Sequence, residues 1–377
     1  MKILYVTATY SPTVNGVAVS VKTTAENLRK LGHEVTVLAP NNPNRDKNEE
    51  HVVRYPSIVN PFVRDYPLPL LSFNAGLFKE KFDIVHAHHP FQIAAFAKKY
   101  AEKSKAPFVF TYHTRYDYYV GTYLKYVPVQ VGKAIIKRTK DFVLHNADLV
   151  IAPSKVIKDE LLAEYSFANI EVVPTGINIS TTATYDKSEL RKEFGIPQNK
   201  KVLLSLSRLA EEKNIDLLLA STKLLPDDFV LVITGAGPYE NVLKQKVISL
   251  DISHKVVFFG ILSRENVAKM YEAADIFMFP SITETQGINL LDAMFHKLPV
   301  VAVKSGVSEE WVPKNVGILT ENTEKDFSRA ILNIESLGTG AGLYARTWAE
   351  KFSIENTSKM MLNAYETVIV KKNLPNR

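Results

Sequence analysis

Short apolar runs and amphipathic stretches alternate along the whole chain. Such alternation is typical of a parallel α/β sheet, in which helices separate buried strands. In the first half, the runs of strand length are Ile3–Thr7, Val35–Ala39, Ile84–Ala87, Phe108–Tyr112, Leu149–Ala152 and Glu171–Val173. In the second half, they are Val202–Ser207, Phe229–Thr234, Val256–Phe259, Ile276–Phe279 and Val300–Val303. The pattern therefore predicts two doubly wound α/β domains.

Helices fit between these strands, and several carry a Ser that can cap the first turn or a Gly that can end the last one. The clearest are Val19–Leu31 with Gly32 after it, Lys155–Ala163 with Ser154 before it, and Ser263–Ala274. A last amphipathic stretch, Ser353–Val370, follows the second sheet, and we expect it to return to the first domain.

The segment Pro174–Asn178 and the polar Ser/Thr run after it indicate a linker. We expect a first domain at residues 1–177, completed by a C-terminal helix at about 355–377, and a second domain at 178–354. A chain of 377 residues with 46% hydrophobic residues is long enough for two cores. Two doubly wound domains that face each other would leave a cleft at the carboxyl ends of their strands, where ligands bind in open α/β sheets.

Composition excludes several classes of protein. The chain has no cysteine, so disulfides, thiolate metal sites and cysteine nucleophiles are ruled out. The first residues turn polar too soon for a signal peptide, and no apolar run reaches the roughly 18 residues of a membrane span. Neither half carries Gly-x-Gly-x-x-Gly after its first strand, nor a Walker-type loop, which disfavours dinucleotides and P-loop chemistry. We expect a cytoplasmic protein with no nucleic-acid partner.

The net charge of +6 comes from the first half. Residues 1–177 hold 22 Lys/Arg against 16 Asp/Glu, whereas residues 178–377 hold 24 of each. A helix predicted at Pro128–His145 places Lys133, Lys137 and Lys140 at i, i+4 and i+7, on one face, while Val131, Ile135 and Phe142 line another. A basic amphipathic helix suits an anionic membrane surface. A packed helix with a solvated lysine face would give the same pattern.

The segment Ser281–Met294 carries two carboxylates, Glu284 and Asp292, around Gly287, which should open a helix. A helix start after a buried strand offers unpaired amides and the positive end of a dipole, and both suit a diphosphate. Glu284 would then reach a sugar hydroxyl, and Asp292 a ribose. A capped helix with a solvated carboxylate would also account for these residues.

Residues at other strand ends could also bind such a ligand. Gly16 follows the first strand, where its small size would let a ligand approach the backbone. Arg208 and Lys213 follow the first strand of the second domain, and two cations there can converge on a diphosphate. Gly235 and Gly237 form a tight turn at a further strand end.

A histidine and an aromatic cluster close the first-domain strand that ends near Tyr112. His113 should face the cleft from this position, and Tyr116, Asp117 and Tyr119 follow it. A histidine with a purely structural role is the competing interpretation.

Taken together, these residues resemble those of glycosyltransferase family 4 (group 1), enzymes of the GT-B fold. The resemblance covers nearly the whole chain. Its motifs are the Asn15-Gly16 loop, the Pro174–Asn178 linker, Arg208 with Lys213, Gly235-Ala-Gly237, and Glu284-x7-Asp292. It implies two Rossmann-like domains, an interdomain cleft and a C-terminal helix that crosses back to the first domain.

The resemblance also implies transfer of a sugar from a nucleoside-diphosphate donor with retention of configuration, and no bound metal or other cofactor. Glu284 would hold donor sugar hydroxyls, and the amides of Gly287, Ile288 and Asn289 would bind the diphosphate. Arg208 and Lys213 would neutralise charge on the leaving group. Gly16 would approach the donor from the first domain, and His113 would line the sugar and acceptor side.

Asp292 departs from the family pattern, which usually has a second Glu at this position. Within the family, the His113–Tyr119 segment and Thr283–Gly287 look most like enzymes that glucosylate diacylglycerol. This likeness implies UDP-glucose as donor, a lipid acceptor and peripheral association with the inner face of the cell membrane. No oligomeric state is predicted. A transferase with a soluble acceptor, a nucleotide-sugar epimerase and a non-catalytic nucleotide-sugar sensor are the alternatives.

Overall fold

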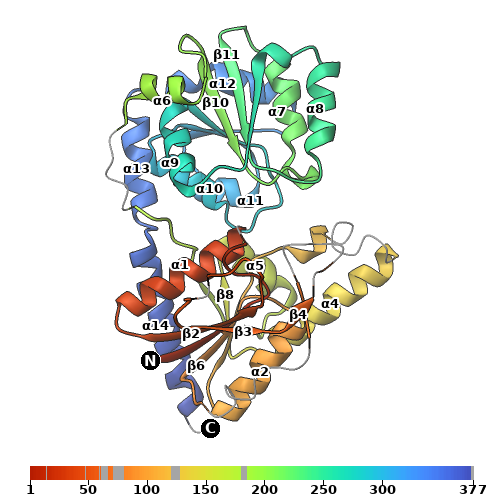
Figure 1. Cartoon of the computed structure of the whole chain (residues 1–377), viewed down its shortest axis with the longest axis vertical. Coiled ribbons are helices and arrows are strands. Elements are labelled where there is room, and N and C mark those ends of the chain that lie inside the picture. Colours follow the sequence, from red (N-terminus) through yellow and green to blue (C-terminus); the bar gives the residue numbers. More distant parts are fainter. Residues whose placement is uncertain are drawn as a thin grey trace. The chain divides into compact units, whose positions relative to one another are not determined.

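The computed structural model describes residues 1–13, 15–46, 48–58, 60, 67–70, 80–119, 128–179 and 185–374, with the backbone alone at Asp117 and Tyr119. The chain forms two compact units (Figure 1). Unit 1 comprises Met1–Gly176 and Ile354–Arg377, and unit 2 comprises Ile177–Ser353. The polar run at 180–184 in the predicted linker lies outside the described residues.

Unit 1 contains a seven-stranded parallel sheet with the order β3-β2-β1-β6-β7-β8-β9. Its strands are β1 (Lys2–Val6), β2 (Glu34–Pro40), β3 (Val52–Tyr55), β6 (Ile84–Ala87), β7 (Phe108–Thr111), β8 (Leu149–Ala152) and β9 (Ile170–Val172). A separate antiparallel pair joins β4 (Ser57–Ile58) to β5 (Leu68–Pro69). The helices are α1 (Gly16–Lys30), α2 (Gln92–Ser104), η2 (Tyr116–Tyr119), α4 (Val129–Asn146), α5 (Lys155–Glu164) and α14 (Ile354–Asn373).

Unit 2 contains a six-stranded parallel sheet with the order β12-β11-β10-β13-β14-β15. Its strands are β10 (Lys201–Leu206), β11 (Phe229–Thr234), β12 (Val256–Gly260), β13 (Ile276–Phe279), β14 (Val300–Val303) and β15 (Gly317–Thr320). The helices are α6 (Lys187–Glu193), η3 (Glu211–Lys213), α7 (Ile215–Lys223), α8 (Glu240–Ser249), η4 (Ser253–Lys255), α9 (Arg264–Ala273), α10 (Ile288–Phe295), α11 (Gly306–Trp311), α12 (Glu324–Leu332), η5 (Ile334–Leu337) and α13 (Ala341–Glu350).

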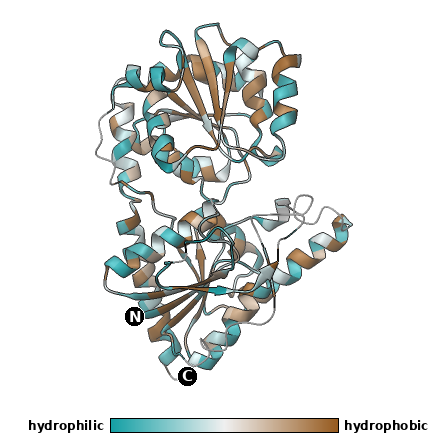
Figure 2. Ribbon diagram, viewed as in Figure 1, coloured by the Kyte–Doolittle hydropathy of each residue, from teal (hydrophilic) through white to brown (hydrophobic). Residues whose placement is uncertain are grey.

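Both sheets are buried on both faces, which explains why their central strands are continuous apolar runs. Each sheet has one hydrophobic cluster on either side, and most strands of both units are coloured as hydrophobic in Figure 2. The strands predicted from apolar runs are confirmed to within a residue or two. Four further strands were missed. In the parallel sheets, β3 contains Arg54 within its four residues, and β15 is short and begins with a glycine. The other two are the two-residue strands β4 and β5.

The last helix, α14, packs on α1 within unit 1, as predicted for the C-terminal segment. Tyr365 is fully buried, and its hydroxyl lies 3.2 Å from that of Tyr5 on β1. Near the end of the helix, Lys372 forms an ion pair of 2.7 Å with Asp148. The final helix is therefore part of the core of unit 1.

The strand orders set the positions at which each unit can bind a ligand. In unit 1 the chain leaves β1 towards β2 and later returns to β6 on the other side, so the order reverses between β1 and β6. In unit 2 the reversal lies between β10 and β13. Ligands of doubly wound folds bind outside the carboxyl ends of the strands at such reversals.

Candidate functional site

The carboxyl ends of β10, β11 and β13 form one site in unit 2. The amide of Leu209, after β10, donates to the carbonyl of Ala236, after β11, at 3.0 Å. The side-chain amide of Asn289, in the first turn of α10, donates to the carbonyl of Leu206 at 2.6 Å. The three predicted motifs of the second domain therefore lie together at the point where the strand order reverses.

Gly235 and Gly237 allow the loops after β10 and β11 to touch. A Cβ at Gly235 would lie 1.9 Å from the carbonyl oxygen of Ser207, and one at Gly237 would lie 2.2 Å from that of Leu209. Gly235 also has a φ of +120°, a conformation that side chains disfavour. Contact between two backbones thus accounts for both glycines, and their predicted role in donor binding is an additional hypothesis.

Gly287 opens α10, as predicted, in the left-handed conformation with φ +75° and ψ +60°. A Cβ at this position would lie 2.9 Å from Cζ of the buried Phe279. The first amides of an α-helix have no partner inside the helix and carry the positive end of its dipole. Gly287, Ile288 and Asn289 thus supply the amides of a potential anion site.

Lys213 and Glu284, which are 71 residues apart in sequence, form an ion pair of 2.6 Å. Their side chains are 15% and 23% exposed, so the pair is accessible but not freely solvated. Arg208 pairs with Glu212, four residues further along the same loop. The two predicted cations are therefore both present at the site, and each is partly neutralised by a carboxylate.

Asn214 joins the loop after β10 to the loop after β13, a role that the sequence did not reveal. Its side-chain amide donates to the carbonyl of Pro280 at 3.1 Å and to the side chain of Asn322 at 2.9 Å. Its own backbone is left-handed, with φ +57°, and the Asn side chain tolerates this conformation better than most. Asn214 therefore helps to hold Lys213 next to Glu284.

Asp292 lies on α10 beside α9. Burial raises the pKa of its carboxyl to about 6, and the charges of His296 and Arg264 oppose this rise only in part. His296 is itself 2.6 Å from Glu272 and stacks on Tyr271, with ring centroids 5.3 Å apart. Among the described residues, the charges of His296 and Arg264 are therefore too weak to offset the cost of burying this carboxylate.

In unit 1, Gly16 begins α1 at the reversal of strand order. Asn15 caps this helix by accepting from the amide of Ala18 at 2.9 Å and donates to the side chain of Thr9 at 3.0 Å. A Cβ at Gly16 would meet no described atom within 4 Å. Packing inside the described part of the chain therefore gives no reason for a glycine at this position, unlike at Gly235.

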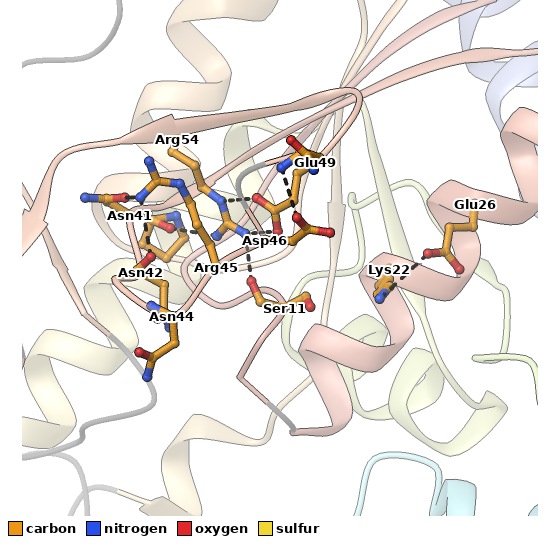
Figure 3. A network of polar contacts seen from close by, with 12 residues as sticks. Ser11, Lys22, Glu26, Asn41, Asn42, Asn44, Arg45, Asp46, Glu49 and Arg54 are labelled. Carbon is orange, nitrogen blue, oxygen red and sulfur yellow. Dashed lines mark hydrogen bonds and ion pairs between the residues drawn. The ribbon is translucent and has the colours of Figure 1, made fainter. Parts of the chain in front are cut away.

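Arg54 of β3 holds the loop between β1 and α1, as Figure 3 shows. Its guanidinium donates to the carbonyls of Ser11 at 2.7 Å and Pro40 at 2.8 Å, and it pairs with both oxygens of Glu49. The side chain is only 9% exposed and lies over the ring of Tyr10. Through this fork-shaped contact, Arg54 ties the loop before Gly16 to β3.

The end of β6 and the loops after β6 and β7 bring four histidines together beside the same strand ends. They are His86, His88, His89 and the predicted His113. His113 Nε2 lies 3.0 Å from His88 Nδ1, and burial lowers the pKa of His113 to about 3. His113 is therefore neutral at physiological pH. The sequence His-Ala-His-His, which spans the end of β6 and the start of the next loop, would have signalled this cluster.

The predicted acceptor segment is described in part. Tyr116 packs edge-on against Tyr112 and Phe91, with ring centroids 6.4 Å and 6.1 Å away. The side chains of Asp117 and Tyr119 lie outside the described residues. A cavity of about 410 Å³ lies beside this segment, and Arg115, Tyr118, Lys133 and Glu160 are among its lining residues.

Helix α4 differs from its predicted division into a basic and an apolar face. Lys140 is only 13% exposed, since it pairs with Glu164 and lies over the ring of Tyr165. Val131 and Ile135 were predicted to line an apolar face apart from the lysines, but they are 49% and 40% exposed. The buried residues of α4 are instead Gly132, Ile136, Val143 and Leu144, and the helix carries hydrophobic and hydrophilic residues along its length in Figure 2.

Among the described residues, no group of three or more His, Asp or Glu side chains has an arrangement that could hold a metal ion. Within the same residues, no helix is both long and apolar enough to span a membrane.

Two family models match the chain. One described as Glycosyltransferase Family 4 matches residues 14–181, and one described as Glycosyl transferases group 1 matches residues 186–348. An alpha-monoglucosyldiacylglycerol synthase of Streptococcus pneumoniae is 32% identical over 389 residues, covering 99% of this chain and 87% of that protein. A protein of the same name from Acholeplasma laidlawii is 29% identical and covers 90% of each chain.

Solved structures share the fold at lower sequence identity. A sucrose-phosphate synthase from Thermosynechococcus elongatus has a TM-score of 0.78 and 18% identity, covering 98% of this chain and 100% of that one. Anabaena HepE, solved in complex with UDP and glucose, has a TM-score of 0.76 and 20% identity, covering 97% and 100%. These likenesses confirm the predicted pair of Rossmann-like α/β domains.

Proposed function

The chain belongs to glycosyltransferase family 4, has the GT-B fold and is a hexosyltransferase; on this basis we propose that it transfers glucose from UDP-glucose to a membrane lipid such as 1,2-diacylglycerol, with retention of configuration. The relatives named as monoglucosyldiacylglycerol synthases support this donor and acceptor. The cation pair and the start of α10, gathered at the carboxyl ends of β10, β11 and β13, support the proposal most strongly.

The donor diphosphate would bind between the loop of Arg208 and the amides that begin α10. Both groups offer hydrogen-bond donors to negative charge, and a helix N-terminus is a common phosphate site. The bound anion would compete with Glu212 and Glu284 for the two cations. Glu284 could then turn one oxygen towards hydroxyls of the sugar while Lys213 approaches the phosphate.

The chemical step would depend on electrostatic stabilisation. As the bond from the sugar to the diphosphate breaks, negative charge grows on the leaving oxygen, where Arg208 and Lys213 would stabilise it. Preorganised donors of this kind usually make the largest single contribution to catalysis. The leaving phosphate oxygen would itself accept the acceptor's proton, and His113 would line the sugar.

The acceptor would come from the membrane surface through unit 1. The first turns of α4 expose Val129, Val131 and Ile135, and they also expose Lys133 and Lys137. Exposed apolar side chains of a helix can insert between lipid headgroups while its lysines contact anionic lipids. We propose this part of α4 as the membrane contact and the neighbouring tyrosines, Tyr116 and Tyr119, with Asp117, as the acceptor region.

A transfer assay tests the proposed donor and acceptor. The purified protein is incubated with glucose-labelled UDP-glucose, with and without micelles that contain diacylglycerol. Label in the lipid extract that depends on diacylglycerol is the expected result. If label appears only in an added sugar phosphate or oligosaccharide, the acceptor is soluble, and if the donor isomerises without any acceptor, the enzyme is an epimerase.

Liposome sedimentation tests the membrane contact separately. Replacing Lys133 and Lys137 by Glu should release the protein from anionic vesicles at low salt. The matched control replaces Lys304 and Lys325, two exposed lysines of unit 2, and changes the net charge equally. Equal loss of binding in both double variants would show that only total charge matters.

A further inference from the structure

Three histidines follow one another closely at the end of β6 and are almost fully buried. His86, His88 and His89 are 0%, 3% and 4% exposed. Both ring nitrogens of His86 have partners, since Nδ1 lies 2.6 Å from the Tyr365 hydroxyl and Nε2 lies 2.7 Å from that of Thr111. His86 thus has a structural role in joining β6 to its neighbours.

His88 is held from three sides. Its ring stacks on His86 with centroids 4.2 Å apart and meets the edge of Tyr5 at 4.5 Å. Its Nδ1 lies 3.0 Å from Nε2 of His113. Its Nε2 is buried and has no hydrogen-bond partner in the described part of the chain. The ring therefore cannot turn without losing these contacts.

The contact between His88 and His113 requires one donor and one acceptor, because both rings are neutral. Burial lowers the pKa of His88 well below its ordinary value, and that of His113 to about 3. If His113 donated from Nε2, the proton of His88 would reside on its own Nε2 and form a buried N–H without a partner. Orphaned buried N–H groups are rare in folded proteins. If His88 donates from Nδ1, its Nε2 carries no proton, and only the lone pair of that nitrogen is left without a partner.

We infer that His88 is a positioning residue, which donates its Nδ1–H to His113 and thereby fixes the ring plane of His113 and keeps its proton on Nδ1. The inference rests on the proposed function in so far as His113 borders the donor sugar. With its proton on Nδ1, the His113 ring carries its hydrogen-bond donor at that atom. It would not act as a general base at that atom.

The tautomer of His113 is the direct test. Long-range ¹H–¹⁵N spectra of the full chain, labelled in its nine histidines, show which nitrogen of each ring carries the proton. The His113 signal is assigned by its loss in His113→Gln. We expect protonation at Nδ1 in the wild-type protein. A wild-type His113 protonated at Nε2 would overturn the inference without any further variant.

Two substitutions separate the hydrogen bond from the packing. In His88→Asn, the side-chain amide can replace Nδ1–H, so the tautomer should persist and kcat should fall less than about threefold. In His88→Leu, the donor is lost, so His113 should populate both tautomers and kcat should fall about 10- to 100-fold, the loss typical of partners that orient a functional histidine. KM for the donor should change less than kcat.

Tyr365→Phe is the matched control, because it removes a buried hydroxyl that contacts His86 and does not contact His113. It should lower the melting temperature and leave the His113 tautomer unchanged. An unchanged tautomer in His88→Leu, or a changed tautomer with undiminished transfer, would refute the positioning role. If the wild-type protein transferred no glucose, the proposed function would be refuted. The spectra would still test the hydrogen bond from His88 to His113.

Discussion

We predict that Asp292→Asn stabilises unit 2 and weakens donor binding at the same time. The folded state raises the pKa of this carboxyl from 3.8 to about 6. Each unit of such a rise corresponds to about 1.4 kcal/mol, so the ionised carboxylate costs the folded state up to about 3 kcal/mol above pH 7. Asparagine has nearly the same shape and carries no charge, which removes this cost.

The sign of the pH dependence follows from the direction of the shift. Between pH 3.8 and about 6, the folded protein binds more protons at Asp292 than the unfolded chain does, so the free energy of unfolding falls as the pH rises. Above pH 6 this loss is complete. The advantage of Asp292→Asn should therefore be about 3 kcal/mol at pH 8 and about 1 kcal/mol at pH 4.5.

Tryptophan fluorescence can follow unit 2 alone. The chain has two tryptophans, Trp311 and Trp348, and both lie in unit 2. Trp311 is buried, and Trp348 donates to its carbonyl at 3.1 Å, so urea unfolding of this unit should change the emission. In the same variant, KM for the nucleotide sugar should rise about tenfold, since a charged acceptor of hydrogen bonds is lost.

Asp275→Asn is the control, because it should change the free energy of unfolding of unit 2 in the opposite direction. Burial alone would raise the pKa of Asp275, but the amide of Val202 together with Lys187 and Arg191 brings it below the ordinary value. Its replacement should destabilise unit 2 by about 2 kcal/mol, because charge-assisted hydrogen bonds are lost. If Asp292→Asn also destabilises unit 2 at pH 8, burial of an uncompensated charge is the wrong description of Asp292.

Four further substitutions test the loops at the strand ends of the two units. Lys213→Ala should lower kcat by about 10²- to 10³-fold in the transfer assay, because it removes a preorganised cation from the leaving group; a variant that keeps more than half its turnover would contradict this role. Gly235→Ala should lower the melting temperature and the yield of folded protein, since its Cβ would lie 1.9 Å from the Ser207 carbonyl, whereas Gly16→Ala should melt like the wild-type protein and lose donor affinity in calorimetry. Arg54→Lys should lower kcat about tenfold with little change in net charge, because a lysine cannot replace the bidentate contact to Glu49 and the contact to Ser11 together; unchanged kinetics would show that the loop needs no such support.

The sequence predicted the fold well because the strands are buried on both faces and therefore appear as unbroken apolar runs. It also predicted which strand ends carry the site, since parallel strands place their carboxyl ends along one edge. It did not predict which charges would pair there. The contact between Lys213 and Glu284 depends on the conformation of two loops, one of them tied by the left-handed Asn214.

Other residues were missed or misjudged because their partners are distant in sequence. Arg54 supports a loop more than 40 positions earlier in the chain, and His88 contacts His113 only through the pairing of β6 with β7. Lys140 was assigned to an open basic face because helical spacing alone does not show that Glu164 of α5 lies beside it. In each case, the contact of the side chain depends on a neighbouring strand, helix or loop that is distant in sequence.

The return of α14 to unit 1 has a consequence for how the chain matures on the ribosome. Unit 2 is one continuous segment, Ile177–Ser353, and can close as soon as it has emerged. The core of unit 1 is complete only when Tyr365 of α14 lies beside Tyr5. The folding of Met1–Gly176 therefore cannot be completed until α14 has been synthesised. Although domains usually fold in the order of their synthesis, here unit 2 should be finished first, and a stop codon that removed α14 would damage unit 1, which precedes unit 2 in the sequence.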